Sequence, residues 1–304
     1  MVNQVDFSVG PGETLGVIGE SGCGKSVTSL SIMRLIPKPW GRIDSGQVML
    51  QGEDLFLRSA ADFRKIRGRE ISMVFQDPMT SLNPVLTIGV QLFEVLDHLG
   101  LTGKQKHQRA IELLNEVGIS DAPQRLKAYA HELSGGMKQR VMIAMAIAAN
   151  PKVLIADEPT TALDVTIQAQ ILRLLKKLQS DYNMSLVLIT HDLGVVAQVC
   201  DHVLVMYGGH VVEKAAVSDL FRSPLHPYTA GLIRSIKSLT DKTTKKLYTI
   251  PGQVPRLGQF GQGCVFYSRC DQRKERCEIE KPPLSNEAGE HQAACFYPVS
   301  LGVL

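Results

Sequence analysis

Residues 19–26, Gly-Glu-Ser-Gly-Cys-Gly-Lys-Ser, match the pattern G-x-x-x-x-G-K-[ST] of a phosphate-binding loop. In such a loop the glycines let backbone N–H groups point at phosphate oxygens, and the following helix adds the positive end of its dipole. We expect Lys25 to reach the β- and γ-phosphates of a nucleotide and the Ser26 hydroxyl to be a ligand of Mg²⁺. The residues predicted to bind nucleotide are Gly19, Glu20, Ser21, Gly22, Cys23, Gly24, Lys25 and Ser26.

Two carboxylates, Asp157 and Glu158, follow the apolar run Val153–Ala156. The end of a buried strand is where an acidic residue holds Mg²⁺, so we assign that role to Asp157. Glu158 is then the natural general base for an attacking water, a role worth about 10²–10⁴-fold in rate. The alternative is an N-cap aspartate and a surface glutamate before Pro159, but the phosphate-binding loop upstream favours the catalytic interpretation.

Two further polar side chains follow predicted strands. Gln76 comes after Ile71–Phe75 and is placed to sense Mg²⁺ and the attacking water. His191 comes after Leu186–Thr190, where an imidazole could contact the γ-phosphate, although a lone histidine is most often structural. The predicted catalytic residues are Glu158, His191 and Gln76, and the predicted Mg²⁺ ligands are Ser26, Gln76 and Asp157.

A second glycine-rich element, Ser134, Gly135 and Gly136, lies just before the predicted helix Met137–Ala149. Backbone N–H groups at such a helix start can bind an anion by the same combination of donors and dipole. Ser134 also fits a plain helix N-cap, and the two roles can hold together.

Four of the six cysteines are crowded near the end of the chain: Cys264, Cys270, Cys277 and Cys295. Five, six and seventeen residues separate them, so the close C-x-x-C pairs of zinc ribbons do not occur. Four thiolates could hold zinc or an iron–sulfur cluster, and in a reducing compartment disulfides rank third. We expect Cys23 and Cys200 to be structural.

The elements that must position these residues indicate an α/β core. Thr14–Ile18, Val153–Ala156 and Leu186–Thr190 are apolar runs without alternation, as expected of parallel strands covered on both faces. Helical spacing over Ser26–Leu35 and Ile167–Gln179 alternates with these strands. This alternation predicts a doubly wound α/β fold.

Changes in composition divide the chain into three predicted parts. The ATP-binding core is expected at 1–85 and 151–220, with a mostly helical insertion at 86–150. Within the insertion, polar and apolar residues alternate with helical period from Val90 to Gly118. Residues 221–304 are rich in proline and glycine, which predicts a C-terminal extension of turns and short strands carrying the four-cysteine site.

The bulk composition excludes several classes of protein. An apolar fraction of 44% with 21% charged residues is ordinary for a globular protein, and a net charge of +3 is too small to suggest nucleic-acid binding. The longest apolar runs, such as Val141–Ala149, fall short of the roughly twenty residues that span a bilayer. The first residues lack the pattern of a secretory signal, so we expect a cytosolic chain whose membrane role comes through a partner.

Residues 133–140, Leu-Ser-Gly-Gly-Met-Lys-Gln-Arg, resemble the signature of ATP-binding cassette (ABC) ATPases when taken with the phosphate-binding loop and the acidic pair. Four further stretches resemble the ATPase subunits of bacterial oligopeptide and dipeptide permeases: Phe75–Pro84, Ala156–Thr166, His226–Thr229 and Gly263–Cys270. Family members often have proline where Ser268 lies. The resemblance covers nearly the whole chain.

The resemblance implies a P-loop NTPase (RecA-like) core with a parallel sheet and an antiparallel β edge, a helical ABC subdomain and a cysteine-containing C-terminal extension. It implies that Ser134, Gly135 and Gly136 cap the γ-phosphate of ATP held by the opposite subunit, in trans. It also places Asp164 in a loop that crosses the dimer interface. At the four cysteines it favours a [4Fe–4S] cluster over zinc.

The resemblance further implies an importer, in which ATP hydrolysis at the cytoplasmic face of the inner membrane powers uptake of di- and oligopeptides. The implied partners are a second, non-identical ABC ATPase subunit, two membrane permease subunits and an extracytoplasmic peptide-binding protein, without nucleic acid. The segment after Gln76 would receive the coupling helix of the permease. Peptides are the expected cargo, and nickel or another small solute is the alternative.

Two other kinds of function fit less well. Soluble ABC proteins of translation or DNA repair carry two cassettes or a long coiled coil, and neither is present here. A binding module with inactive ATPase chemistry conflicts with intact Lys25, Glu158 and His191.

The given sequence starts eighteen residues before Gly19. Val5–Val9 alternates like a half-buried strand, and Phe7 matches a core phenylalanine of the family. Family members carry a further leading strand and an aromatic residue that stacks on adenine, but no Tyr or Trp precedes the loop here. Because base–aromatic stacking is worth about 1–3 kcal/mol, we expect weakened ATP binding and a less stable sheet.

Overall fold

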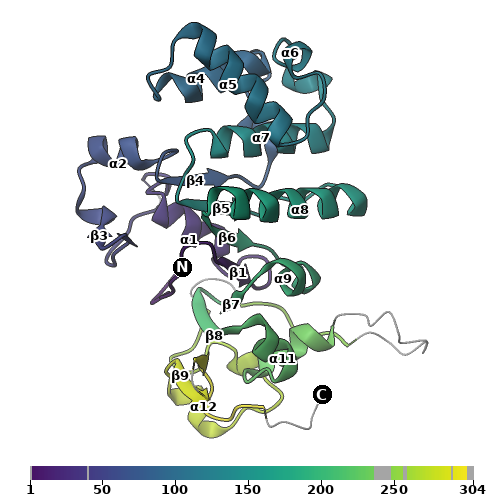
Figure 1. Cartoon of the computed structure of the whole chain (residues 1–304). Helices are drawn as coiled ribbons and strands as arrows, with labels where there is room; N and C mark the ends of the chain where they lie inside the picture. Colours follow the sequence, from purple (N-terminus) through teal and green to yellow (C-terminus); the bar gives the residue numbers. More distant parts are fainter. Residues whose placement is uncertain (1, 40, 236–247, 256–258, 289, 300–304) are drawn as a thin grey trace. The chain divides into compact units, whose positions relative to one another are not determined.

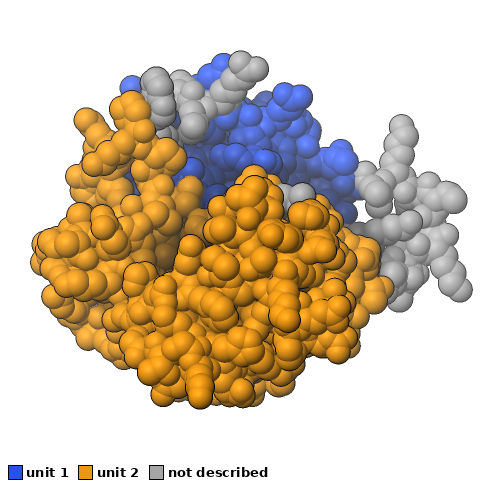
Figure 2. All heavy atoms as spheres, turned by 90° about the horizontal axis from the view of Figure 1, so that it is seen from above, with its two compact units in different colours: residues 1–8, 14–28, 189–304 blue, residues 9–13, 29–188 orange. Residues whose placement is uncertain are grey.

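The computed structural model describes residues 2–39, 41–235, 248–255, 259–288 and 290–299. The chain divides into two compact units, coloured separately in Figure 2. Unit 1 contains residues 1–8, 14–28 and 189–304, and unit 2 contains residues 9–13 and 29–188. Unit 1 therefore combines the beginning of the chain with its end.

Unit 2 contains three neighbouring strands in the order β4 (Ile71–Val74), β5 (Val153–Asp157) and β6 (Ser185–Ile189, whose last residue belongs to unit 1). β4 and β5 run parallel, with Ile71 opposite Val153. The long helix α8 (Val165–Tyr182) connects β5 to β6. Every residue of β4 and β6 is buried, which agrees with their mostly apolar sequences and with the absence of alternation.

Helices fill the segment between β4 and β5 (Figure 1). They are α3 (Pro78–Ser81), α4 (Ile88–Asp97), α5 (Gly103–Glu116), α6 (Ala122–Arg125), the 3-10 helix η2 (Ala130–Glu132) and α7 (Gly135–Ile147). In α4 the fully buried residues Ile88, Leu92 and Leu96 recur every four positions, which is the spacing of one helix face.

The helical pattern expected from Val90 to Gly118 is interrupted, because the chain forms α4 and α5 with a break between them. Gly100 in the break has a φ of 70°, a conformation that side-chain-bearing residues rarely adopt. The next helix then starts with its own cap, because the Gln105 side chain accepts a hydrogen bond of 2.8 Å from the Thr102 N–H. Periodicity alone did not mark this interruption.

The remaining elements of unit 2 are short. They are the hairpin strands β2 (Met49–Leu50) and β3 (Glu53–Asp54), the 3-10 helix η1 (Leu55–Leu57) and α2 (Ala60–Ile66). The hairpin turns at Gln51 and Gly52, whose φ angles of 52° and 86° are the left-handed pair that a two-residue hairpin requires.

In the described part of unit 1 the strands lie in the order β1 (Thr14–Ile18), β7 (His202–Tyr207), β8 (His210–Ala216), β10 (His291–Ala293) and β9 (Ser285–Ala288). β1 and β7 are parallel, whereas β8 is antiparallel to β7 and β10 is antiparallel to both of its neighbours. The predicted α/β fold with parallel strands and an antiparallel edge is confirmed. The cysteine-rich end of the chain also contributes to this sheet, since Gln292 of β10 lies opposite Lys214 of β8.

The helices of unit 1 are α9 (Leu193–Val199), α10 (Val217–Arg222), α11 (Pro227–Arg234), the 3-10 helix η3 (Tyr267–Arg269) and α12 (Glu275–Ile279), and α1 (Lys25–Ile32) begins in unit 1 and ends in unit 2. Residues 5–9, predicted as a strand from their alternation, belong to no strand. Alternation indicates which side chains face a core, but a strand also needs a neighbour with which to pair. Among the described residues, no helix is both long and apolar enough to cross a membrane.

Candidate functional site

The phosphate-binding loop in unit 1 has the predicted strand, loop and helix around it. β1 is buried at all five positions and leads directly into Gly19, and α1 begins at Lys25. Gly19 has a φ of 152°, and a Cβ atom there would lie 2.2 Å from the carbonyl oxygen of Met206. Gly22 and Gly24 also have positive φ angles, of 81° and 105°. The loop therefore needs glycine for its backbone conformation and, at Gly19, for close packing.

Lys25 lies within the curve of this loop. Its side chain is only 5% exposed, and Nζ donates hydrogen bonds to the carbonyl oxygens of Gly19 (2.8 Å) and Glu20 (3.3 Å). The neighbouring Cys23 is buried, and burial raises the pKa of its thiol even though the charge of Lys25 acts in the opposite direction. These hydrogen bonds hold the Lys25 side chain in place, and the buried Cys23 fits the structural role predicted for it.

Glu20, the second residue of the loop, contacts the C-terminal part of unit 1. Its N–H donates to the hydroxyl of Tyr228 (2.8 Å), and its carboxylate forms an ion pair with Arg269 (2.5 Å). Neither partner was predicted from the sequence. No local signal marks them, because Arg269 is 249 residues away along the chain.

Gln76 and Glu158 meet in unit 2. Gln76 follows β4 and Glu158 follows β5, and parallel neighbours end at the same edge of a sheet. The Gln76 Nε2 donates to the Glu158 carboxylate at 3.0 Å, and the Thr161 hydroxyl donates to the same oxygen at 2.9 Å. Asp157, the last residue of β5, is 4% exposed. Three of the predicted residues thus gather at one edge, and Thr161 is a further orienting residue that the sequence analysis did not assign.

Glu158 itself has an unusual backbone. Its φ is 45°, in the left-handed region that non-glycine residues seldom occupy. Residues held in sparsely populated regions cluster at functional sites, where the surrounding structure enforces them. This conformation turns the chain directly after the buried strand and leaves the Glu158 side chain only partly buried, unlike Asp157.

Ser134, Gly135 and Gly136 lie at the start of α7. The Ser134 hydroxyl accepts a hydrogen bond from the Met137 N–H (3.3 Å), so the N-cap role is present. Ser134 and Gly135 are exposed. A Cβ on Gly136 would lie 2.8 Å from the Ile167 side chain, so α8 packs closely against this glycine. Asp164 caps α8 by accepting from the Ile167 N–H at 3.0 Å.

His191 lies in unit 1, directly after β6. The N–H of the preceding Thr190 donates to the Val17 carbonyl oxygen of β1 (3.1 Å), which places His191 beyond the carboxyl end of that pairing. Its side chain is exposed. The next residue, Asp192, caps α9 by accepting from the N–H groups of Gly194 (2.7 Å) and Val195 (3.3 Å).

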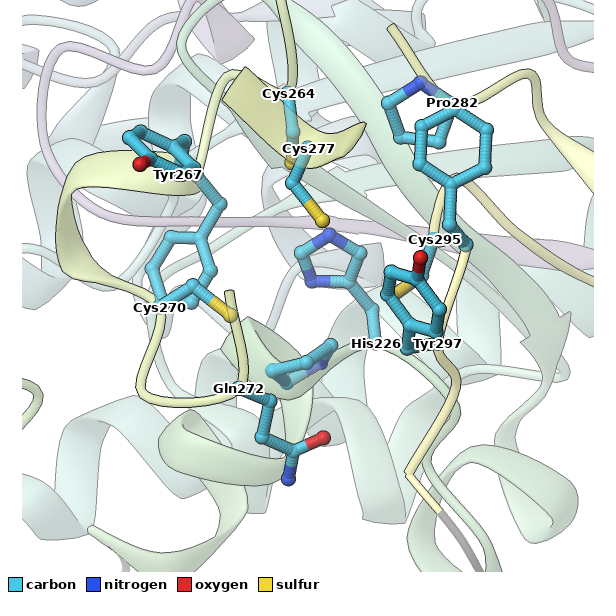
Figure 3. A pocket seen from close by; sticks show the side chains of 12 residues that line it. His226, Cys264, Tyr267, Cys270, Gln272, Cys277, Pro282, Cys295 and Tyr297 are labelled. Carbon is cyan, nitrogen blue, oxygen red and sulfur yellow. The ribbon is translucent and has the colours of Figure 1, made fainter. Parts of the chain in front are cut away.

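The four clustered cysteines line a single cavity, together with His226 and several aromatic side chains (Figure 3). All four are free thiols. Burial raises the pKa of Cys270 to about 11 and that of Cys295 to about 12. Four thiols around one apolar cavity suit a soft metal centre. Even so, no three His, Cys, Asp or Glu side chains among the described residues are arranged to hold a metal ion.

Solved structures with this arrangement define the class of protein. A dimeric ATP-binding cassette in a post-hydrolysis state, bound to ADP and Pi, has a TM-score of 0.63 and 28% identity, covering 71% of this chain and 90% of its own. The cbiO1 protein of Clostridium perfringens, part of an ABC transporter complex, has a TM-score of 0.62 and 27% identity, covering 72% and 83%. The fold is therefore that of an ABC-type ATPase.

Sequence comparisons narrow the class further. Residues 2–161 match the family described as ABC transporter, and residues 212–277 match the family described as oligopeptide/dipeptide transporter, C-terminal region. The oligopeptide transport ATP-binding protein AppD of Bacillus subtilis is 53% identical over 97% of this chain and 90% of its own length. The dipeptide transport ATP-binding protein DppD of Escherichia coli is 49% identical over 98% and 91%. The chain belongs to the ABC transporter ATP-binding proteins of the oligopeptide/dipeptide family.

Proposed function

We propose that this chain is the ATP-hydrolysing subunit that powers import of di- and oligopeptides across the cytoplasmic membrane. The observation that carries the ATPase assignment is the contact between Gln76, Thr161 and Glu158 beside the buried Asp157. The peptide assignment rests on relatives of about 50% identity that are named for oligopeptide and dipeptide transport.

In the proposed reaction the residues of the loop hold the phosphates, with the Lys25 ammonium neutralising charge on the β- and γ-groups. Ser26, Asp157 and Gln76 would hold Mg²⁺, which when bound offsets the charge that develops on the transferred phosphoryl group. Glu158 takes a proton from water, whose oxygen attacks the γ-phosphorus as the bond to the ADP oxygen breaks. The hydrogen bonds from Gln76 and Thr161 fix the orientation of the Glu158 carboxylate for this step.

We further propose that Ser134, Gly135 and Gly136 bind ATP held by a second ABC ATPase, which is a non-identical chain. Ser134 and Gly135 are exposed at the start of a 13-residue helix, where backbone N–H groups and the helix dipole favour an anion. Asp164, which caps the neighbouring helix α8, is proposed to lie at the same dimer interface. His191 is assigned to the γ-phosphate in its own chain.

The remaining partners are proposed to be two membrane permease subunits and an extracytoplasmic peptide-binding protein, which would hold this chain at the cytoplasmic face of the membrane. Segment 77–87 after Gln76 is the candidate receptor for the permease. Val85, at 75% exposure, is a large apolar side chain left uncovered there. Reconstitution with the permease and binding protein tests the cargo, because peptides and not Ni²⁺ should stimulate ATP hydrolysis.

We propose that Cys264, Cys270, Cys277 and Cys295 hold a [4Fe–4S] cluster, with zinc as the alternative. Their position around one cavity supports the proposal, although closing a ligand set requires the side chains to move closer together. Such a cluster would cross-link and so stabilise a proline-rich region that has little hydrophobic core of its own. Anaerobic purification followed by iron and acid-labile sulfide assays tests the proposal, and zinc alone or no metal would refute the cluster.

The substitution Glu158→Gln tests the ATPase assignment. It keeps the size of the side chain but removes the base, so steady-state ATP hydrolysis should fall by about 10²–10⁴-fold. Binding of MgATP should persist, and ATP should accumulate in a stable dimer. Glu94→Gln, an exposed glutamate on α4, is the matched control and should keep native turnover. Unchanged hydrolysis in Glu158→Gln would show that the catalytic assignment is wrong.

A further inference from the structure

The ion pair between Glu20 and Arg269 has the geometry of a two-pronged contact. Nη1 of Arg269 lies 2.5 Å from one carboxylate oxygen of Glu20, and Nη2 lies 3.1 Å from the other. The Arg269 side chain is 4% exposed, whereas Glu20 is 31% exposed. Bidentate contacts of this kind are strong and fix direction as well as distance. The carboxylate of Glu20 is therefore held from the interior of unit 1.

Arg269 is itself held by several groups, so it is a rigid anchor. Its Nε donates to the Pro251 carbonyl oxygen (2.9 Å), and Nη1 approaches the Tyr207 hydroxyl (3.4 Å). An arginine side chain stays protonated in proteins. The guanidinium is therefore a permanent positive charge in a fixed orientation.

A second contact holds the backbone of the same residue. The Glu20 N–H donates to the Tyr228 hydroxyl at 2.8 Å. Tyr228 is fully buried, and its ring packs against those of Tyr207 (4.8 Å between centroids) and Phe266 (5.4 Å). Residues of the C-terminal region thus hold both the main chain and the side chain of Glu20.

These contacts matter because the glycine residues leave the backbone of the loop with little conformational restraint of its own. Gly19, Gly22 and Gly24 surround Glu20 with positive φ angles, and glycine loses more conformational entropy on ordering than any other residue. If the loop is already ordered before ATP binds, this loss of conformational entropy does not weaken binding. Glu20 also brings a negative charge next to the expected site of a polyphosphate, and Arg269 neutralises it.

We propose that Arg269 and Tyr228 are positioning residues that preorganise the phosphate-binding loop, so that the C-terminal region sets the affinity for ATP. This inference rests on the proposed ATPase function. Its signature is a change in ATP affinity with turnover at saturation retained, because an ordered loop contributes equally to ground-state and transition-state binding.

The test compares full-length variants by MgATP titration, by KM and kcat for hydrolysis, and by melting temperature. Arg269→Gln should raise the Kd and KM for MgATP by about ten- to a hundredfold, as expected when a charge-assisted contact that orders the loop is lost. The Kd and KM of Arg269→Lys should lie between those of native protein and Arg269→Gln, since the lysine ammonium neutralises Glu20 without the two-pronged geometry. Arg273→Gln, an exposed arginine four residues further on, is the matched control and should behave as native.

Tyr228→Phe is the second variant, because Arg269→Gln has the added hazard of misfolding. It removes only the hydroxyl and leaves the ring packing in place. We expect a KM for MgATP several-fold above native, with kcat within about twofold and a native-like melting temperature, in line with the loss of one hydrogen bond.

The outcomes separate the two levels of inference. If native protein neither binds nor hydrolyses MgATP, the proposed function fails. If native protein does both, and Tyr228→Phe and Arg269→Lys keep its Kd and KM, the positioning role is overturned. A fall in kcat at unchanged KM also overturns it, because that pattern assigns the contacts to the chemical step.

Discussion

Two regions with predicted site residues are built in different ways. In unit 2, Gln76 and Glu158 meet because β4 and β5 are parallel neighbours, and Thr161 reaches Glu158 from three residues along the chain. In unit 1, the glycine-rich loop has its Glu20 held by Tyr228 and Arg269, from 208 and 249 residues away. Strand pairing thus fixes the first region, whereas the second depends on the C-terminal region.

The difference has a physical reason. A side chain at the end of a buried strand inherits its position from the ladder of backbone hydrogen bonds. A loop with several glycines has no comparable restraint of its own, so contacts from elsewhere must supply it. Substitutions in the C-terminal region should therefore change nucleotide affinity, and substitutions at the edge of β4 and β5 should change turnover.

The largest expected effect comes from Glu213, a fully buried carboxylate on β8. It accepts hydrogen bonds from the N–H groups of Leu225 (2.7 Å) and His226 (3.0 Å) and contacts the His291 ring (2.7 Å). Glu213→Leu leaves two buried N–H groups without an acceptor at about 1–3 kcal/mol each. Chemical denaturation should show a loss of several kcal/mol of stability, and the KM for ATP should rise.

The same variant separates an effect on ATP affinity from an effect on turnover, because kcat at saturating ATP should stay close to native. Glu213→Gln retains one acceptor oxygen and should be less harmful, which makes it the conservative control. Native stability in Glu213→Leu would show that the C-terminal region does not depend on this carboxylate.

Thr161→Val probes the edge of β4 and β5 and should have a smaller effect. It removes one hydrogen bond to the Glu158 carboxylate, worth about 0.5–1.5 kcal/mol, so kcat should fall by about three- to tenfold. The KM for ATP should be unaltered, the opposite of the pattern expected for Tyr228→Phe. Thr166→Val, a threonine at the start of α8, controls for loss of a hydroxyl. A changed KM with native kcat would contradict the proposal that the edge of β4 and β5 controls turnover and not affinity.

The smallest predicted effect is a dependence of stability on pH through His210. Burial, followed by the charge of Lys281, lowers the pKa of His210 to about 4 from an ordinary 6.5. The unfolded chain therefore binds a proton as pH falls through 6.5, while the folded chain stays neutral until about 4, so stability is lost across this window. Solvent screening limits the loss to on the order of 1 kcal/mol.

Denaturation at pH 7 and pH 5 measures this loss, and His210→Gln should flatten the dependence by removing the group. His98→Gln, which changes an exposed histidine of unit 2, is the control. Equal pH dependence in native protein and His210→Gln would contradict the prediction. Neither histidine substitution should change the kcat for ATP hydrolysis.

Local patterns predicted much of the fold and the candidate site. The strand before Gly19, the helix after it and the buried strand before Asp157 all followed from apolar runs bounded by glycine or carboxylate. The same patterns failed for residues 5–9 and for the break near Gly100. A strand needs a partner and a helix break needs one residue with positive φ, and periodicity reports neither.

Short sequence patterns were enough to predict the chemistry of this protein, from the phosphate-binding loop, the acidic pair, the second glycine-rich element and the four cysteines. These depend on residue type and short spacing, which local backbone geometry enforces. Only the tertiary structure decided that Thr161 orients Glu158, that all four cysteines share one cavity, and that Arg269 and Tyr228 hold Glu20. Such contacts join distant segments through the packing of a whole unit, and no local pattern records which segments will meet.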